Sequence, residues 1–450
     1  MKSLFISTLL LVGLSGFSQE HFTGLTSSNR LGIISASNNP AELVNMSKTF
    51  EISFFGISAN AANDKIGFSD LFSDNFEEQI FEGNKSVNLA IDAEIFGPSF
   101  AMKYKGWGFG LTTKIKGKLD VVDVDPTLGD GLINSGINSL FGANTISNNN
   151  NQRFNGTTWG EIGLTAARTI YNDETHKVSV GATFKLLFPG SYANLGLDKF
   201  NGTITNNLGN VELTNTTANL NITYSGSLAD SFSNFSDYTK SAVGSLNGFS
   251  GDIGVNYQWK DDNDTKANNN YKVNFGASVR NIGSMTFKDK DNQSTNYNLN
   301  IQGAQSLNLN QFQNVDSLEE IEDILLSSGY LTATDGTKDF KVNLPTTLSL
   351  YADVKLIQAL YVSGYLQQRM KENSGNDQIS AQNMITLTPR FYTGIFEVYA
   401  PFSNSEISGF NTGIGFRVGG FYLGSGSIVT ALINDSKQAD VYLGFRYGFL

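Results

Sequence analysis

Few residues of this chain have types and spacings suited to catalysis or metal binding. The two histidines, His21 and His176, lie far apart in the sequence, and neither stands beside a serine in a GxSxG-type motif. The chain has no cysteine, which removes thiolate catalysis, cysteine zinc sites, iron–sulfur clusters and disulfide bonds. Asp120, Asp123 and Asp125 lack the glycine and glutamate spacing of calcium loops. We therefore expect no enzyme, no metal site and no cofactor.

Charged residues recur instead at alternate positions of apolar segments. Phe109, Leu111 and Ile115 alternate with Lys114 and Lys116, which is the period of a β-strand with one apolar and one polar face. By the same parity, one face of the predicted strands carries the charged residues Lys114, Lys116, Lys118, Asp120, Glu161, Lys185, Asp252, Lys272, Arg280, Asp353, Arg390, Glu397, Arg417 and Arg446. If the strands close into a barrel, these side chains face the lumen, where they could line a hydrated path or pair across it. Their mixed signs favour pairing.

About 14 such strands can be placed in the sequence. Their ranges are 49–60, 87–104, 108–121, 157–171, 177–190, 248–259, 271–283, 344–355, 359–369, 381–392, 395–402, 411–418, 421–427 and 440–450. Long and short connections alternate along the chain, and most of the short ones are tight turns such as Lys105-Gly106 and Gly419-Gly420. A β-sandwich gives the same alternation within a strand but has no reason to sort its connections. The pattern predicts an all-β, antiparallel, up-and-down transmembrane barrel with long loops outside and short periplasmic turns.

Both ends of the chain fit export to the outer membrane of a Gram-negative bacterium. Lys2 followed by the apolar run Leu4–Leu14 is typical of a signal peptide of residues 1–18, cleaved near Ser18/Gln19. No later run of about 18 apolar residues predicts a membrane helix. The last strand ends on Tyr447 and Phe449, typical of the signal that the barrel-assembly machinery recognises, so we expect that machinery and outer-membrane lipid as partners. A net charge of −11 argues against a nucleic-acid partner.

Two further patterns concern the rim and the loops. Aromatic residues near the predicted strand ends are expected to form girdles at the headgroup level: Trp107, Trp159, Tyr171, Trp259, Tyr271, Tyr399, Phe421 and Tyr422. Arg168 falls on the lipid face, which predicts either a side chain that reaches the periplasmic rim or an unseen bulge. Within a long loop, Ser317 precedes acidic residues and an apolar pattern from Leu318, which predicts a capped helix.

The segment before the first strand carries a resemblance to a known family. A stretch of small residues leads to Asn39-Pro40-Ala41-Glu42-Leu43, which resembles the start of FadL-type fatty-acid transporters, including the PorV-like barrels of type IX secretion. Glu42 stands where those barrels usually have glycine. Residues 276–283 and the tail 415–449 also resemble segments of this superfamily. The resemblance implies that residues 19–48 are a plug or hatch inside a barrel formed by residues 49–450, and that the barrel has about 14 strands.

Three functional hypotheses remain open. The resemblance favours a FadL-like channel for small hydrophobic or amphipathic molecules. The alternative is a non-transporting barrel that serves as a scaffold or shuttle for secretion partners, as PorV-like barrels do. A surface-attached β-sandwich adhesin is the third. A lateral opening at a kinked strand near the plug would favour the channel, whereas a sealed lumen with a large exposed apolar loop surface would favour the scaffold.

Overall fold

The computed structural model describes residues 21–26, 28–70, 73, 79–133, 141–230, 242–260, 271–289, 291–433 and 435–449. The predicted signal peptide and its cleavage site therefore lie outside the described residues. No helix among the described residues is both long enough and apolar enough to cross a membrane.

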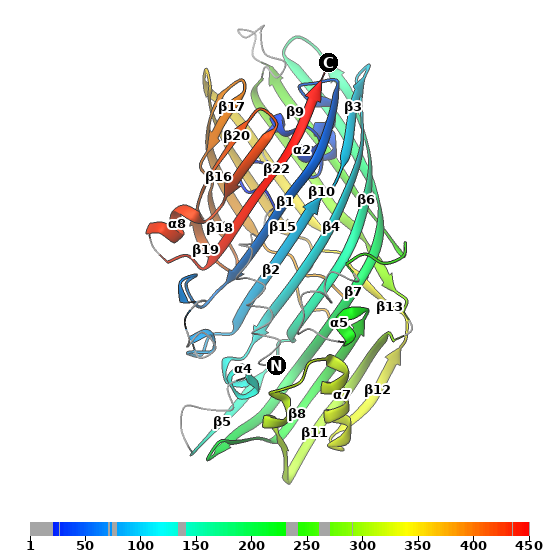
Figure 1. Cartoon of the computed structure of the whole chain (residues 1–450), viewed down its shortest axis with the longest axis vertical. Helices are drawn as coiled ribbons and strands as arrows, with labels where there is room; N and C mark the ends of the chain where they lie inside the picture. The colour runs from blue at the N-terminus through cyan, green and yellow to red at the C-terminus, as the bar shows by residue number, and fades with distance from the viewer. Residues whose placement is uncertain are drawn as a thin grey trace.

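A closed ring of 14 antiparallel strands forms the body of the molecule (Figure 1). Its strands in chain order are β1 (Phe50–Asn63), β2 with β3 (Val87–Phe96, Ser99–Tyr104), β4 (Trp107–Val124), β6 (Gln152–Asn172), β7 (His176–Asn207), β9 (Gly248–Lys260), β10 (Tyr271–Phe287), β13 with β14 (Phe340–Asn343, Thr347–Ile357), β15 (Leu360–Arg369), β16 (Met384–Thr393), β17 with β18 (Phe396–Tyr399, Phe402–Ser405), β19 with β20 (Gly409–Thr412, Ile414–Val418), β21 (Phe421–Ser425) and β22 (Gln438–Phe449). The first and last strands pair from Phe50↔Phe449 to Ala62↔Gln438, which closes the ring. The predicted barrel and strand positions are confirmed.

The outer face of the ring is apolar. On β4, Phe109, Leu111 and Ile115 are 39–42% exposed, whereas the side chain of Lys114 on the opposite face is 8% exposed. A sheet in a bilayer satisfies all its backbone hydrogen bonds only when it is closed, and its outer face must be apolar. The protein is therefore a β-barrel of the outer membrane.

The outward-facing Arg168 lies at the periplasmic rim. Its partner across the sheet is Trp107, the first residue after the Lys105-Gly106 turn, and its guanidinium stacks over the Trp107 ring at 5.0 Å. A long side chain at this position can place its charge at the headgroup level. This agrees with the prediction of a side chain that reaches the periplasmic rim.

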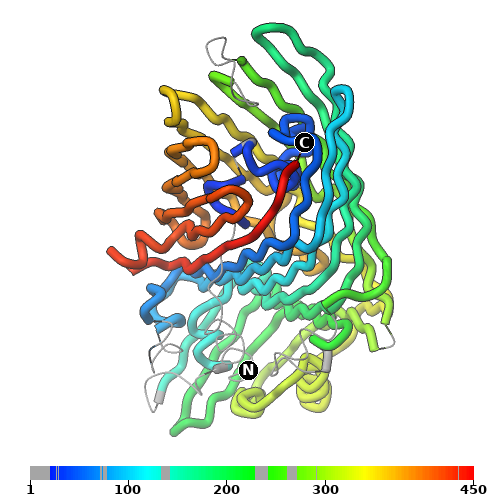
Figure 2. Tube along the Cα trace, turned by 45° about the horizontal axis from the view of Figure 1, so that its top comes forward, coloured from blue at the N-terminus to red at the C-terminus, as the bar shows by residue number. Residues whose placement is uncertain are grey.

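Beyond the membrane the wall continues on one side as a tall extracellular sheet (Figures 1 and 2). β7 has 32 residues, which is about 100 Å of extended chain, several times what is needed to cross a bilayer. Its outer half pairs with β5 (Phe141–Asn148) and β8 (Asn210–Ser225), and β8 continues to β11 (Gln293–Asn308) and β12 (Leu331–Thr337). The sequence predicts that residues 122–156, 191–247 and 284–343, which connect barrel strands, are loops. Instead, β5, β8, β11, β12 and the outer half of β7 occupy much of these ranges.

Four short helices cover the outer face of this extracellular sheet and bury a second hydrophobic core. They are α4 (Pro126–Ile133), α5 (Ser227–Asp230), η4 (Leu309–Phe312) and α7 (Leu318–Ser327). α7 is the predicted loop helix, and Ser317 Oγ accepts a hydrogen bond from Glu320 N at 3.1 Å, as an N-cap should. Glu322 of α7 accepts hydrogen bonds from the Tyr224 and Tyr297 hydroxyls, which fasten the helix to the sheet.

Candidate functional site

The segment that precedes β1 lies inside the barrel and is almost wholly buried (Figures 1 and 2). It contains three short helices, η1 (Asn29–Leu31), α2 (Ile33–Ala36) and η2 (Pro40–Asn45). Its apolar side chains pack against inward-facing residues of the wall, among them Phe96, Tyr399, Tyr422 and Tyr442. We call residues 21–48, without residue 27, the plug.

The motif Asn39-Pro40-Ala41-Glu42-Leu43 forms the start of η2 and its contact with the wall. Asn39 Oδ1 caps the helix by accepting from Ala41 N at 3.0 Å, and Asn39 Nδ2 donates to Val255 O at 2.8 Å. Two wall glycines let the backbone of the motif approach closely: a Cβ on Gly181 would lie 2.5 Å from Ala41 N, and one on Gly254 would lie 2.1 Å from Asn39 Oδ1. The motif therefore fits a groove in the wall that stays open because residues 181 and 254 are glycine.

Glu42 is buried and accepts several hydrogen bonds in the lumen. Its Oε1 accepts from Asn256 Nδ2 at 2.9 Å, from Asn274 Nδ2 at 2.8 Å and from the Tyr351 hydroxyl, while Oε2 accepts from Asn45 Nδ2 at 2.8 Å. A buried carboxylate is stable when neutral donors saturate its oxygens. The residue that departs from the FadL-type motif thus ties the plug to β9, β10 and β14.

The charges predicted for the lumen mostly lie there, in ion pairs. Lys114 and Lys116 both contact Glu94, at 2.9 and 3.1 Å, and Lys118 contacts Asp92 at 3.0 Å. The other inward pairs are Lys185 with Asp252 at 2.8 Å and Glu161 at 3.8 Å, Arg446 with Glu51 at 2.6 Å, and Arg417 and Arg390 with Glu397 at 3.0 and 3.3 Å. Arg280 donates instead to Gln367 Oε1 at 2.6 Å and to the Tyr365 hydroxyl at 3.2 Å. The charged side chains of the described lumen therefore mostly form pairs and do not form a row of free charges.

Lys272 is the exception, because a bulge at the start of β10 shifts the register. Tyr271 pairs with Lys260 and Val273 with Trp259, so Lys272 has no partner position of its own. The ammonium of Lys272 lies 5.4 Å from the ring of Trp259, which is 43% exposed on the outer face. Lys272 is therefore not in the lumen, and Tyr271, expected on the rim, is 1% exposed inside it.

The predicted girdle divides into two groups. Trp107, Tyr171, Trp259 and Phe421 are exposed on the outer face, whereas Trp159, Tyr271, Tyr399 and Tyr422 are buried in the interior. The interior group follows the inward parity of neighbouring charges, such as Glu161 beside Trp159. Tyr399 and Tyr422 contact the plug, so these rings position it rather than anchor the barrel in lipid.

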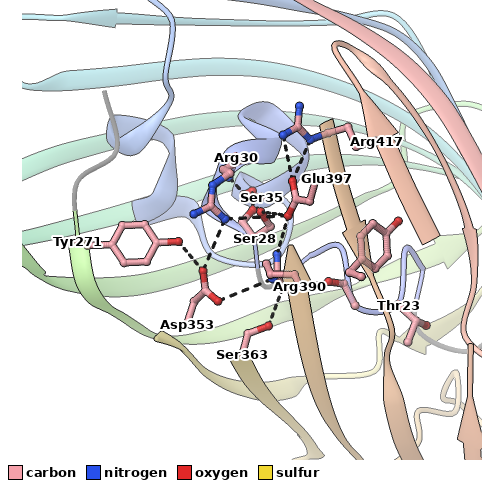
Figure 3. Close-up of polar contacts among 12 residues, drawn as sticks. Thr23, Ser28, Arg30, Ser35, Tyr271, Asp353, Ser363, Arg390, Glu397 and Arg417 are labelled. Carbon is pink, nitrogen blue, oxygen red and sulfur yellow. Dashed lines mark hydrogen bonds and ion pairs between the residues drawn. The ribbon is translucent and has the colours of Figure 1, made fainter. Parts of the chain in front are cut away.

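A cluster of charged side chains holds the plug near the periplasmic end of the lumen (Figure 3). Ser28 Oγ donates to Glu397 at 3.2 Å, and Arg390 donates to Gly24 O at 3.1 Å. The guanidinium of Arg30 lies between Asp353 and Glu397, at 3.9 and 4.0 Å. The sequence analysis missed Arg30, although it is the plug's one arginine and its charge in a segment of small residues was a usable signal.

Above the plug lies a cavity of about 690 Å³. Its floor includes Phe22, Ile34 and Asn38 of the plug, its wall carries charged side chains of β2, β4 and β7, and its roof is the loop between β15 and β16. The charged side chains that line it are Asp64, Asp92, Glu94, Lys114, Lys116, Lys118, Asp120, Asp123, Lys185, Asp198, Arg280, Arg369, Glu372 and Glu406. The cavity is therefore polar, with both signs of charge.

Arg153 holds the roof of this cavity in place. Its side chain donates to Asn373 O at 2.6 Å, to Ser380 Oγ at 3.2 Å and to Gly375 O. These contacts link the roof loop to β6, on the other side of the lumen mouth. The loop thus covers part of the cavity from outside, and the plug closes it towards the periplasm.

Several buried polar atoms of the cavity lining have no hydrogen-bond partner among the described residues. They are Ser37 Oγ, Asn38 Nδ2, Asp120 Oδ2, Trp159 Nε1, Thr347 Oγ1 and both amide atoms of Gln382. Buried polar groups are nearly always satisfied by protein, water or ligand. This set of donors and acceptors can bind water or a polar group of a bound molecule.

The remaining candidate residues make structural contacts, and His21 also lines the cavity. His176 contacts the Tyr257 hydroxyl at 2.8 Å, His21 contacts Asp92 at 3.3 Å, and Asp125 caps α4 through Thr127 N. Among the described residues, no three histidine, aspartate or glutamate side chains are grouped so that they could hold a metal ion. Phe449 stacks on Phe50 at 5.6 Å, at the seam of the barrel.

The fold and site define a plugged outer-membrane β-barrel with a polar cavity between plug and roof. The chain belongs to a family of unknown function, DUF5723, whose model matches residues 40–426. No curated protein matches its sequence.

Among solved structures, the chain is similar to the P. putida toluene transporter TodX, a FadL-type barrel, at 10% identity over 96% of this chain and 99% of that chain, with a TM-score of 0.47. It is also similar to the translocator domain of the autotransporter NalP from Neisseria meningitidis, at 5% identity over 89% of each chain and a TM-score of 0.31. These likenesses concern the fold alone and indicate no substrate for this chain.

Proposed function

We propose that this protein is a plugged channel for small amphipathic molecules, which enter a polar extracellular cavity and pass when the plug moves. The observation that carries the proposal is the cavity of about 690 Å³ between the plug and the roof loop, with unsatisfied donors and acceptors in its wall. Ligand sites commonly have volumes of roughly 300–1,000 Å³. The proposal assigns no catalytic role to any residue.

The side chains that line the cavity favour amphipathic substrates over purely hydrophobic ones. Asp92, Glu94 and three lysines of β4 face the cavity, whereas Phe22, Ile34 and Phe96 supply apolar surface at its floor. Desolvating these charges against a purely hydrophobic molecule would be unfavourable, because their water would be lost without replacement. A molecule with a polar head and a short apolar part matches both surfaces.

A break in the wall beside the plug also fits the channel. The strand formed by β2 and β3 is interrupted at Gly97-Pro98, and β1 has a bulge opposite, between Ser53 and Phe55. Phe96, next to the break, packs in the same cluster as the plug. Gly97 N donates a hydrogen bond to Thr113 O at 2.8 Å, which helps to keep the wall closed here, so any lateral route would need this bond to open.

The proposal is tested by reconstituting the full-length barrel in liposomes and measuring entry of small zwitterionic and neutral solutes. The matched comparison is a variant with Lys114, Lys116 and Lys118 replaced by glutamine, which nearly keeps the size of the lining and removes the three cations of β4. We expect uptake of zwitterionic amphipathic solutes to fall in the variant while uptake of neutral sugars is unaffected. Equal uptake of every solute by both proteins would refute the assigned cavity.

The second candidate, a scaffold or shuttle for secretion partners, is favoured by the tall extracellular sheet with its own hydrophobic core. β12 lies at an edge of this sheet, and Thr332 to Thr337 are exposed. Two results together would favour this candidate. The barrel never opens, and a defined exported protein co-purifies with it only when β11 and β12 are present. Tyr447 and Phe449 as an assembly signal remain a prediction for either function.

A further inference from the structure

The Arg30 side chain is buried in the lumen, yet it has no hydrogen bond from either terminal nitrogen to any described residue. The side chain is 5% exposed, and its nearest carboxylate oxygens, on Asp353 and Glu397, lie at 3.9 and 4.0 Å. N–H···O hydrogen bonds span about 2.7–3.2 Å. The two terminal nitrogens of Arg30 are therefore held by something other than directed hydrogen bonds.

Tyrosine rings surround the guanidinium of Arg30. Its Cζ lies 4.1 Å from the centroid of the Tyr361 ring, 4.4 Å from that of Tyr392 and 5.8 Å from that of Tyr271. Cations within about 6 Å of an aromatic face are attracted to it, and the attraction grows when water is excluded. We call Tyr271, Tyr361 and Tyr392 the tyrosine cage.

The charges of the wall around the cage are balanced without Arg30. Arg390 contacts Glu397 at 3.3 Å and Asp353 at 3.8 Å, and Arg417 contacts Glu397 at 3.0 Å. These two arginines and two carboxylates compensate one another, so Arg30 is an additional cation. Its site selects a flat, weakly hydrated cation that can stack on rings, rather than a compact ion that keeps its water.

The tyrosine cage adjoins the short turns at the periplasmic end of the barrel. Tyr361 is the second residue of β15, and Tyr392 is the last but one of β16. Tyr392 N donates to Ala359 O in the β14–β15 turn at 2.7 Å. Tyr392 is the partly exposed ring of the three and lies beside these turns, whereas none of the three rings lines the extracellular cavity.

We propose that the tyrosine cage, with Asp353, is a binding site for a small organic cation of the guanidinium type, which Arg30 occupies while the plug is seated. A periplasmic cation that competes for the rings displaces Arg30 and loosens the plug from this side. The site lies beyond the proposed function, which concerns solutes entering the extracellular cavity, and it holds whether or not those solutes pass.

The test removes the resident cation and offers a free one. R30A is purified in detergent, its folding is checked by heat-modifiable gel mobility, and its thermal unfolding is followed with increasing methylguanidinium chloride. We expect a saturable rise in the unfolding temperature of R30A that sodium chloride at equal ionic strength does not give. R168A is the matched control, because it removes an arginine from the outer face, and it should respond as the wild type does.

A second variant tests the rings. In R30A/Y361L the half-saturating concentration of methylguanidinium should rise about tenfold, as expected for the loss of roughly 1.4 kcal/mol of cation–π attraction. If folded R30A gives no saturable response, or responds equally to sodium, the site is refuted. Should R30A fail to fold, wild-type channels in planar bilayers decide: methylguanidinium must raise the current from the periplasmic side only, and no effect or a symmetric effect overturns the proposal.

Discussion

Replacing Gly181 by valine should displace the plug from its groove and leave the ring of strands intact. A Cβ at Gly181 would lie 2.5 Å from both Ala41 N and the Pro40 carbonyl carbon, and 2.8 Å from Pro40 O. These are backbone atoms and cannot rotate away as a side chain can. The plug must therefore move by about 1 Å or leave its groove, since ordinary contacts of a Cβ begin near 3.4 Å.

The size of the effect follows from the cost of overpacking. Extra methyl groups in a well-packed interior cost about 1–3 kcal/mol. Since about 1.4 kcal/mol is a factor of ten, the ratio of unseated to seated plug should rise by ~5- to ~140-fold. Valine itself suits a strand, so the wall of the barrel should not be weakened.

The assay is single-channel recording in planar bilayers, with heat-modifiable mobility as the check on folding. G364V is the matched control, because Gly364 also lies within a strand, β15, but a Cβ there meets nothing within 4 Å. We expect G181V to open far more often than G364V or the wild type. If the three proteins show the same open probability, the close packing of the plug against β7 does not keep the lumen closed, and the reasoning fails.

Three further predictions concern the plug, the roof and the extracellular sheet. Glu42→Leu removes the carboxylate that accepts from Asn45, Asn256 and Asn274 and leaves the Asn274 amide without its acceptor, at a cost of about 1–3 kcal/mol, so trypsin should cut after Arg30 roughly fivefold faster or more; unchanged cleavage would exclude Glu42 as the tie. R153A removes the contacts to the roof loop and should speed trypsin cleavage after Lys371, whereas R168A should not; equal rates in both variants would count against the roof. Burial and the nearby Glu322 carboxylate raise the pKa of Tyr297 to about 12, so its contribution to stability is complete below pH 10 and is lost as the pH rises through about 12; the tyrosinate absorbance that develops near pH 12 should be smaller in Y297F than in the wild type, and a difference between the two proteins that develops near pH 10 instead would contradict the buried contact.

The strand positions could be predicted because alternation is a local signal. Each side chain of β4 from Phe109 to Lys118 faces lipid or lumen according to its parity, and no distant residue is needed to see this. Lys272 shows the limit, because one bulged residue at the start of β10 reverses the parity and leaves no mark in the pattern.

The extracellular sheet was missed for a different reason. β8 alternates Leu220, Ile222 and Tyr224 with polar residues, as a strand should, but it lies within a connection that the barrel scheme treats as a loop. The contacts of the plug with the wall could not be predicted from local sequence patterns. Arg30 meets Tyr361 and Tyr392, more than 300 residues away, only because the ring of strands closes around the plug. The motif at Asn39–Leu43 located the plug segment but not the partners that hold it.

The three tryptophans give the most direct test that the barrel spans a lipid bilayer. Trp107 and Trp259 are 38% and 43% exposed on the outer face, whereas Trp159 is 3% exposed inside. Single-tryptophan variants, with phenylalanine at the other two positions, would be reconstituted in vesicles whose acyl chains carry bromine. The fluorescence of Trp107 and Trp259 should be strongly quenched and that of Trp159 should not. Equal, weak quenching at all three positions would contradict a lipid-facing barrel wall.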